Sequence, residues 1–168
     1  MIYLLLIAVA ALIIGPILWM RPTAYEKRLS RMRLKARSLN LHLETINMGS
    51  DPVYSALALR NPHWPQSGWI RYRLFAANNE RGPSHSVAWR QRRDKSGQLV
   101  WDEDPVAAVA RPATQALLDQ WATSQDGRYM ALEVGERSVA IVWNEQGDEP
   151  EVEQIAVWLR EILAAEAI

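Results

Sequence analysis

Four arginines lie on two short segments in which polar and apolar residues alternate. Residues 69–76 read WIRYRLFA and residues 86–92 read SVAWRQR. Alternation of this kind predicts β-strands whose successive side chains point to opposite faces. If the two strands pair, Arg71, Arg73, Arg90 and Arg92 line one sheet face beside Trp69. Like charges on neighbouring strands repel, so such a face needs acids, an anionic ligand or water around it.

This arginine face admits two interpretations. Guanidinium groups next to an exposed aromatic ring are typical of a platform for anions or single-stranded nucleic acid. The alternative is a solvated face balanced by acids, and it is favoured because residues 38–168 carry 12 basic and 18 acidic residues, a net charge of −6. A nucleic-acid-binding domain is usually basic overall, so nucleic acid is not the expected partner.

Trp64 is a second candidate contact, because it lies in a proline-flanked loop, NPHWPQSG at residues 61–68. A rigid aromatic side chain at such a place can anchor a protein partner. The alternative is that the ring folds back over the sheet edge. The candidate partner surface therefore consists of Trp64, Trp69, Arg71, Arg73, Arg90 and Arg92.

Residue types that support catalysis are sparse. The chain has no cysteine, and its three histidines (His42, His63 and His85) lack metal-ligand spacing. The acidic run at 102–104 lacks the spaced oxygen ligands of a calcium loop, and no nucleophile elbow, phosphate loop or dinucleotide fingerprint is present. We therefore assign no catalytic, cofactor-binding or metal-binding residue. An enzyme whose site joins distant residues, such as His42 with Glu44 or Asp102, stays open as an alternative.

The N-terminus predicts a membrane anchor. Residues 2–20 carry no charge, and as a helix they extend about 28 Å, close to the hydrocarbon thickness of a bilayer. The segment lacks the basic start and the small-residue exit of a cleaved signal peptide, and Trp19 is placed as an interfacial anchor. We expect residues 1–21 to be a retained transmembrane helix.

The flank of this segment predicts its orientation. Between Arg21 and Arg37 lie seven basic residues and one acid, a net charge of +6. The positive-inside rule places such a flank in the cytoplasm. The chain is therefore expected to be a single-pass inner-membrane protein, with its N-terminus outside and its C-terminal domain cytoplasmic.

Residues 22–38 are expected to form a basic amphipathic juxtamembrane helix. Thr23 and Glu26 have the spacing of a capping box, and apolar residues from Tyr25 to Leu39 fall on one face. This face either packs on the soluble domain while the charges set topology, or the helix contacts anionic lipid headgroups. The candidate residues of the membrane interface are Trp19, Arg21, Lys27, Arg28, Arg31 and Lys35.

A single N-terminal span followed by Arg21-Pro22 and Lys27-Arg28 resembles the start of YajC-type translocase accessory subunits and of uncharacterised small bacterial inner-membrane proteins. The likeness covers about the first thirty residues. It implies a small single-pass protein whose cytoplasmic domain serves a membrane complex.

Residues 39–168 predict an α+β domain: a mainly antiparallel sheet with covering helices in two layers. Alternation marks strands at 39–44, 69–76, 86–92 and 98–101, which together suggest an antiparallel meander, and 53–60 is a further strand unless its alanines favour a short helix. A helix runs from Pro112 through Trp121, a hairpin joins 128–134 to 138–143, and apolar residues at helical spacing after Pro150 predict a C-terminal helix.

The lipid bilayer and a protein of unknown identity are the expected partners, and no cofactor or small-molecule substrate is indicated. The function that fits is a non-enzymatic membrane protein with a cytoplasmic protein-interaction domain, for example an accessory subunit of a membrane complex. One alternative is a tethered module that binds anionic lipid or nucleic acid through the arginine face. The membrane-anchored enzyme is the other.

Overall fold

The computed structural model describes Tyr3 and residues 22–60, 68–78, 81–84, 86–104, 111–124 and 127–167. Within these residues, none of the helices combines the length and apolarity that crossing a bilayer requires. The predicted span at residues 1–21 lies outside the described residues apart from Tyr3, so it remains a prediction.

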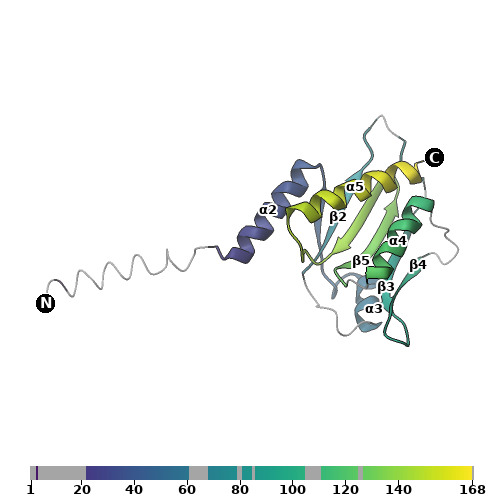
Figure 1. The fold of residues 1–168 in the computed structure, drawn as a ribbon, viewed down its shortest axis with the longest axis horizontal. Helices are drawn as coiled ribbons and strands as arrows, with labels where there is room; N and C mark the ends of the chain where they lie inside the picture. Colours follow the sequence, from purple (N-terminus) through teal and green to yellow (C-terminus); the bar gives the residue numbers. More distant parts are fainter. Residues whose placement is uncertain are drawn as a thin grey trace.

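The centre of the fold is a six-stranded, fully antiparallel sheet with the strand order β1-β2-β6-β5-β3-β4. Figure 1 shows helices that lie across one face of this sheet. Its strands are β1 (His42–Ile46), β2 (Trp69–Phe75), β3 (Val87–Arg93), β4 (Leu99–Asp104), β5 (Tyr129–Gly135) and β6 (Ser138–Trp143). The described helices are α2 (Ala24–Ser38), α3 (Pro52–Arg60), α4 (Pro112–Ser124) and α5 (Glu149–Glu166). The predicted α+β class with a mainly antiparallel sheet is confirmed.

Helices α2, α4 and α5 pack on one face of the sheet, which we call the inner face. The inner-face residues of β2 are Ile70, Tyr72 and Leu74, and they join Met32 of α2 and Ile155 of α5 in one apolar core. Burial of such side chains is the main stabilising contribution. Because Met32 and Ala36 are fully buried in this core, α2 is part of the domain rather than a separate segment.

Helix α3 covers one end of the opposite face, which we call the outer face. Tyr54 and Ala58 of α3 pack there on Trp69, Ala131 and Val142. The fold therefore has the two predicted layers, the sheet and the helices on its inner face, and in addition the short helix α3 on the outer face.

The predicted strand at 53–60 is wrong, and the helical alternative is right. The side-chain oxygen Oδ1 of Asp51 accepts a hydrogen bond from the Tyr54 backbone N–H at 3.3 Å, which is the action of an N-cap. Pro52 occupies the first helical position, where its missing N–H costs nothing.

The expected meander is also wrong, because β2 and β3 do not pair. The β5–β6 hairpin lies between them, with β6 against β2 and β5 against β3. Every residue of β6 is buried, which fits a central strand with a neighbour on each side. The β3–β4 pair and the β5–β6 hairpin agree with the prediction.

Both predicted helices of the C-terminal half are present. Helix α4 begins at Pro112, and α5 carries Pro150 in its first turn and buries its apolar stripe from Val152 to Leu163. The strand predicted at 39–44 begins only at His42, because α2 continues to Ser38 and Asn40 then turns the chain with φ of 63°.

Candidate functional site on the outer face of the sheet

The outer face bears the arginines that the sequence singled out on β2. Arg71 and Arg73 alternate with the buried Tyr72, so both point away from the inner core. In the register of the sheet, Arg71 lies opposite Glu44 of β1, and Arg73 lies opposite Ala140 of β6. The predicted facing of this strand is confirmed.

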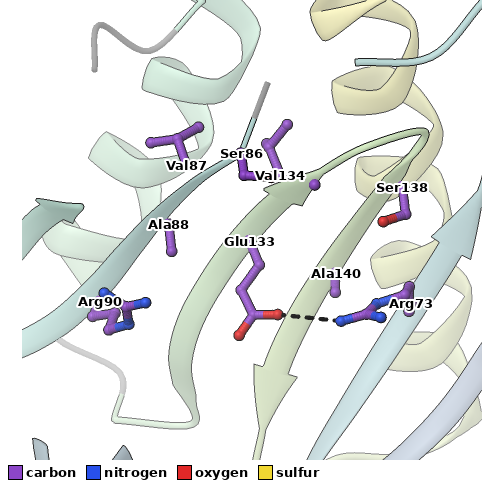
Figure 2. A pocket seen from close by; sticks show the side chains of 10 residues that line it. Arg73, Ser86, Val87, Ala88, Arg90, Glu133, Val134, Ser138 and Ala140 are labelled. Atoms are coloured by element: carbon purple, nitrogen blue, oxygen red, sulfur yellow. Dashed lines mark ion pairs between the residues drawn. The ribbon is translucent and has the colours of Figure 1, made fainter. Parts of the chain in front are cut away.

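Beyond Arg73 the outer face is hollowed. A shallow depression of about 400 Å³ spans β2, β6, β5 and β3, and we call it the outer hollow. Small residues, including Ala88 and Ala140, form its floor. Arg73 and Arg90 lie on either side of Glu133, as Figure 2 shows. Two guanidinium groups and one carboxylate therefore line the hollow, with small side chains beneath them.

Arg90 and Arg92 lie on β3, which is not a neighbour of the strand that carries Arg71 and Arg73. In the sheet register Arg90 lies between Asp102 of β4 and Ala131 of β5, and Arg92 lies opposite Val100. Two strands separate β2 from β3, which corresponds to about 14 Å at the usual strand spacing. The expected row of four adjacent arginines does not form, because the β5–β6 hairpin lies between the two pairs.

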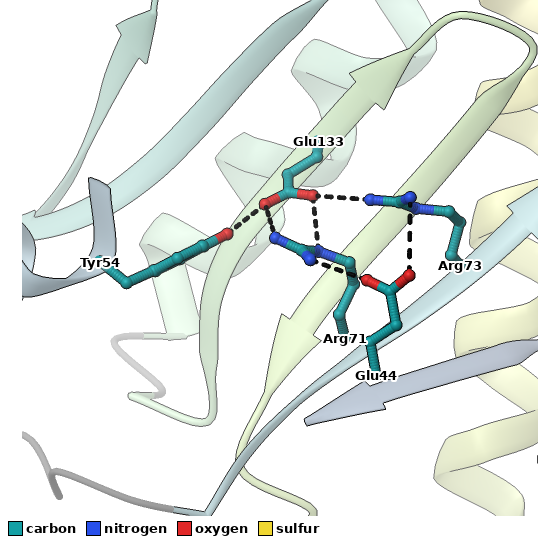
Figure 3. A network of polar contacts seen from close by, with 5 residues as sticks. All are labelled: Glu44, Tyr54, Arg71, Arg73 and Glu133. Carbon is teal, nitrogen blue, oxygen red and sulfur yellow. Dashed lines mark hydrogen bonds and ion pairs between the residues drawn. The ribbon is translucent and has the colours of Figure 1, made fainter. Parts of the chain in front are cut away.

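Arg71 is the centre of a polar network with Glu44, Tyr54, Arg73 and Glu133 (Figure 3). Its Nη1 lies 2.8 Å from Glu44 Oε2, and its Nη2 donates to Glu133 Oε1 at 3.0 Å. Its Nε lies 2.8 Å from Glu133 Oε2. Only 17% of the Arg71 side chain is exposed, so this guanidinium is committed to the fold.

Arg73 is held much more loosely. Its closest carboxylate oxygens are those of Glu44 at 3.8 Å and Glu133 at 3.7 Å, beyond hydrogen-bond distance. Its guanidinium lies 5.9 Å from the centre of the Phe75 ring, and 26% of the side chain is exposed. Arg73 therefore keeps donor capacity for another molecule while Arg71 does not.

Tyr54 brings α3 into the network. Its hydroxyl donates to Glu133 Oε1, and the Arg71 guanidinium lies 5.8 Å from its ring centre. Burial, together with the charge of Glu133, raises the pKa of Tyr54, so the phenol stays a neutral donor at physiological pH. The hydrogen bond from Arg71 lowers the pKa of the Glu44 carboxyl, which keeps it ionised. The network is thus a rigid and nearly neutral frame beside the hollow.

Trp69 is part of the core rather than an exposed contact. Its side chain is fully buried under α3, together with Met48 and Val142. Trp69 therefore does not belong to the accessible surface on which the sequence placed it. Trp64 lies outside the described residues and stays a prediction.

The basic residues of α2 fall into two groups. Arg28 donates to the carbonyl oxygens of Gly147 and Glu145, at 3.0 and 3.4 Å, and Lys35 pairs with Glu153 of α5 at 2.5 Å. Arg31 reaches Glu149 at 3.2 Å from an exposed position, and Lys27 is exposed.

Sequence reasoning missed Arg33, whose guanidinium binds the buried Glu145 carboxylate at 2.6 and 3.0 Å. Trp19 and Arg21 lie outside the described residues.

The histidine alternative gains no geometric support. The His42 ring meets the Phe75 ring edge-on at 5.0 Å, and the depression beside His42 is lined by Arg37, Asn40, Leu41 and Leu43. Glu44 is engaged by Arg71, and His63 and His85 lie outside the described residues. Within the part of the chain that the structure describes, no cluster of three histidine, cysteine or acidic side chains has the geometry of a metal site.

Comparison of the chain with protein-family models, with curated proteins and with solved structures finds no match. The candidate site therefore has to be judged on its own geometry: a rigid ion-pair frame, one loosely paired arginine and an open hollow beside it.

Proposed function

We propose that this chain is a non-enzymatic, single-pass inner-membrane protein whose cytoplasmic domain binds another protein through the outer hollow. The apolar segment at residues 2–20 and the net charge of +6 at residues 21–37 support the membrane attachment and its orientation. The domain that follows supplies the binding surface.

The loose pairing of Arg73 at the rim of the hollow carries this proposal. Arg71, two residues earlier, has three contacts with carboxylates within about 3 Å, whereas the nearest carboxylate to Arg73 is 3.7 Å away. A guanidinium whose donors are not taken up by its neighbours can form a charge-assisted, two-pronged pair with another carboxylate. Arg73 is thus suited to receive an acidic side chain of a partner.

A protein partner fits this surface better than nucleic acid or anionic lipid. Glu44 and Glu133 lie beside Arg71 and Arg73, and Asp102 lies opposite Arg90 in the register. These carboxylates bring the local charge close to zero and would repel a run of phosphates. A surface of alternating charge favours a partner with an alternating polar pattern of its own.

An accessory role in a membrane complex is the form of this function that the likeness to YajC-type subunits suggests. A domain with a fixed binding surface and a membrane anchor suits such a role, because the anchor confines it to the membrane where the partner lies. The expected partner is therefore another protein at the same membrane.

Photocrosslinking in the cells that make the protein tests the proposal. A photoreactive amino acid replaces Ser86, an exposed residue at the rim of the hollow. We expect one crosslinked product of defined mass. Arg73→Ala should lower its yield roughly tenfold, the usual effect of losing one charge-assisted hydrogen bond.

Two controls make the result decisive. The matched arginine control is Arg160→Ala on the exposed side of α5, which should leave the yield unchanged. The same photoreactive group at Gln120 of α4 should not give this product. An equal yield from the Arg73→Ala protein, or a nucleic-acid adduct whose yield falls steeply with salt, would overturn the protein-binding proposal.

A further inference from the structure

We infer that the outward side of α2 lies on the surface of an anionic bilayer and thereby fixes the orientation of the domain. This inference rests on the membrane attachment in the proposed function. It concerns a surface separate from the outer hollow.

The outward side of α2 is basic. At 100° per residue, Lys27, Ser30, Arg31, Leu34 and Arg37 fall within one 120° sector, opposite the buried Met32 and Ala36. All five are exposed, and the single acid of the helix, Glu26, lies just beyond the edge of the sector. The structure thus separates these residues from Arg28 and Lys35, which turn toward the start of α5.

These basic residues remain available to another anion. Within the described residues no ion pair involves Lys27 or Arg37, and Arg31 meets Glu149 with both side chains about half exposed or more, at 66% and 47%. Exposed ion pairs of this kind contribute little to stability, so Arg31 can give up Glu149 for another anion. Three positive charges on one helix face match the headgroups of acidic phospholipids.

An exposed apolar side chain on α2 suits the same surface. Leu34 lies in the middle of the basic sector and is 61% exposed. Tyr25, in the first turn, is also exposed, but it lies on the opposite side of the helix and is not part of this surface. Large apolar and aromatic side chains between basic residues are typical of helices that rest at a membrane interface.

The position of α2 in the chain brings it to the bilayer. Only three residues separate Met20, the end of the apolar segment, from Ala24, the first residue of α2. The four residue-to-residue steps from Met20 to Ala24 span about 14 Å when the chain is fully extended. The first turn of α2 therefore stays within reach of the headgroups. A bilayer is therefore the surface nearest to this face of the helix.

The test uses the absence of cysteine from the chain. Ser30→Cys in the full-length protein is labelled with an environment-sensitive dye and reconstituted into phosphatidylcholine vesicles with or without phosphatidylglycerol. Lipids carrying a quencher at headgroup depth report contact. We expect severalfold stronger quenching in the anionic vesicles, and none for the same dye at Gln120→Cys on α4.

Charge variants test the mechanism. Lys27→Gln with Arg37→Gln should lower the ratio of docked to undocked helix about 30-fold, because each basic residue near the surface contributes about fivefold. The matched pair Lys95→Gln with Arg160→Gln removes the same charge from exposed sites elsewhere and should leave the ratio unchanged.

Flotation of the vesicles separates the two proposals. If the protein floats but the dye at residue 30 escapes the lipid quencher, the contact of α2 with lipid is overturned and the membrane attachment stands. If that dye is hidden from water-soluble quenchers without lipid quenching, a second copy of the chain covers α2 and the inference also fails. A protein that does not float would overturn the membrane attachment itself.

Discussion

Neighbouring arginines of one strand play different roles at the residue scale. Arg71 is enclosed by Glu44, Glu133 and Tyr54, and its removal would leave two carboxylates without their closest cation. Arg73 contributes weak contacts to the same frame and faces the hollow. The strand presents both side chains on one face, and their neighbours decide which of them can bind a partner.

Glu44 should make stability depend on pH in acid. Its pKa is lowered in the folded protein, first by the hydrogen bond from Arg71 and then by the charges of Arg73 and Arg71. The unfolded chain therefore takes up the proton first as the pH falls, and the stabilising contribution of Glu44 is lost. Above the ordinary value of 4.5, this contribution is fully present.

Glu44→Gln measures the effect. Since nearly half of the Glu44 side chain is exposed, we expect wild type to exceed the variant by less than about 1 kcal/mol in the free energy of unfolding at pH 7. The difference should begin to shrink near pH 4.5 and vanish once the pH falls below the lowered pKa of the folded protein. Urea unfolding followed by tryptophan fluorescence in mild detergent gives both values. Glu161→Gln on the exposed side of α5 serves as the control, and a difference that grows in acid would contradict the assignment.

At the scale of elements, α2 is held by a charged interface as well as by its apolar stripe. The Glu145 carboxylate is buried, binds Arg33 through two hydrogen bonds and accepts a third from the Tyr72 hydroxyl at 2.9 Å. Burial and the charge of Glu145 raise the pKa of Tyr72, so this hydroxyl remains a donor. The carboxylate thus joins α2 to the centre of the sheet.

Glu145→Gln should loosen α2 selectively. The substitution keeps the shape but removes the charge that pairs with Arg33, and because 43% of the Arg33 side chain is exposed, we expect a loss of about 1–2 kcal/mol. Hydrogen exchange should accelerate in α2 more than in β6. Glu153→Gln removes the exposed partner of Lys35 and should change exchange little, since pairs of that kind contribute less than about 1 kcal/mol. Equal effects of the two variants would show that Glu145 does not hold the helix.

At the scale of the whole molecule, the proposed membrane segment and the domain meet at α2. The helix begins three residues after the apolar segment, and its buried side enters the core of the domain. A force or rotation at the anchor would therefore be transmitted to the sheet rather than absorbed in a linker. The outer hollow would then have a defined orientation relative to the bilayer.

Reporter fusions to the C-terminus test the orientation. With residues 2–20 in the bilayer and the basic flank inside, a fluorescent protein that folds only in the cytoplasm should be bright when it is fused after Ile168. Alkaline phosphatase, which needs the oxidising periplasm, should be inactive at the same site. The opposite pattern of the two reporters would show that the domain lies outside.

The sequence alone determined the features that depend on local spacing. The capping box of α2, the facing of Arg71 and Arg73, the β5–β6 hairpin and the buried stripe of α5 were all predictable. Helical and strand periods place side chains by their separation along the chain, so a short window carries this information. The Asp51-Pro52 pair is a local signal of the same kind for the start of α3, and it favours the helical alternative over the strand expected at residues 53–60.

Only the tertiary structure decided which strands are neighbours and which charges meet. Pairing between β2 and β6 joins residues about 70 positions apart, and a strand's own sequence does not specify its partner. The separation of Arg71 and Arg73 from Arg90 and Arg92, the burial of Trp69 and the burial of Glu145 against Arg33 all follow from that arrangement. Local spacing assigns a side chain to a face, and long-range packing decides what it meets, because the second depends on the free energy of the whole core.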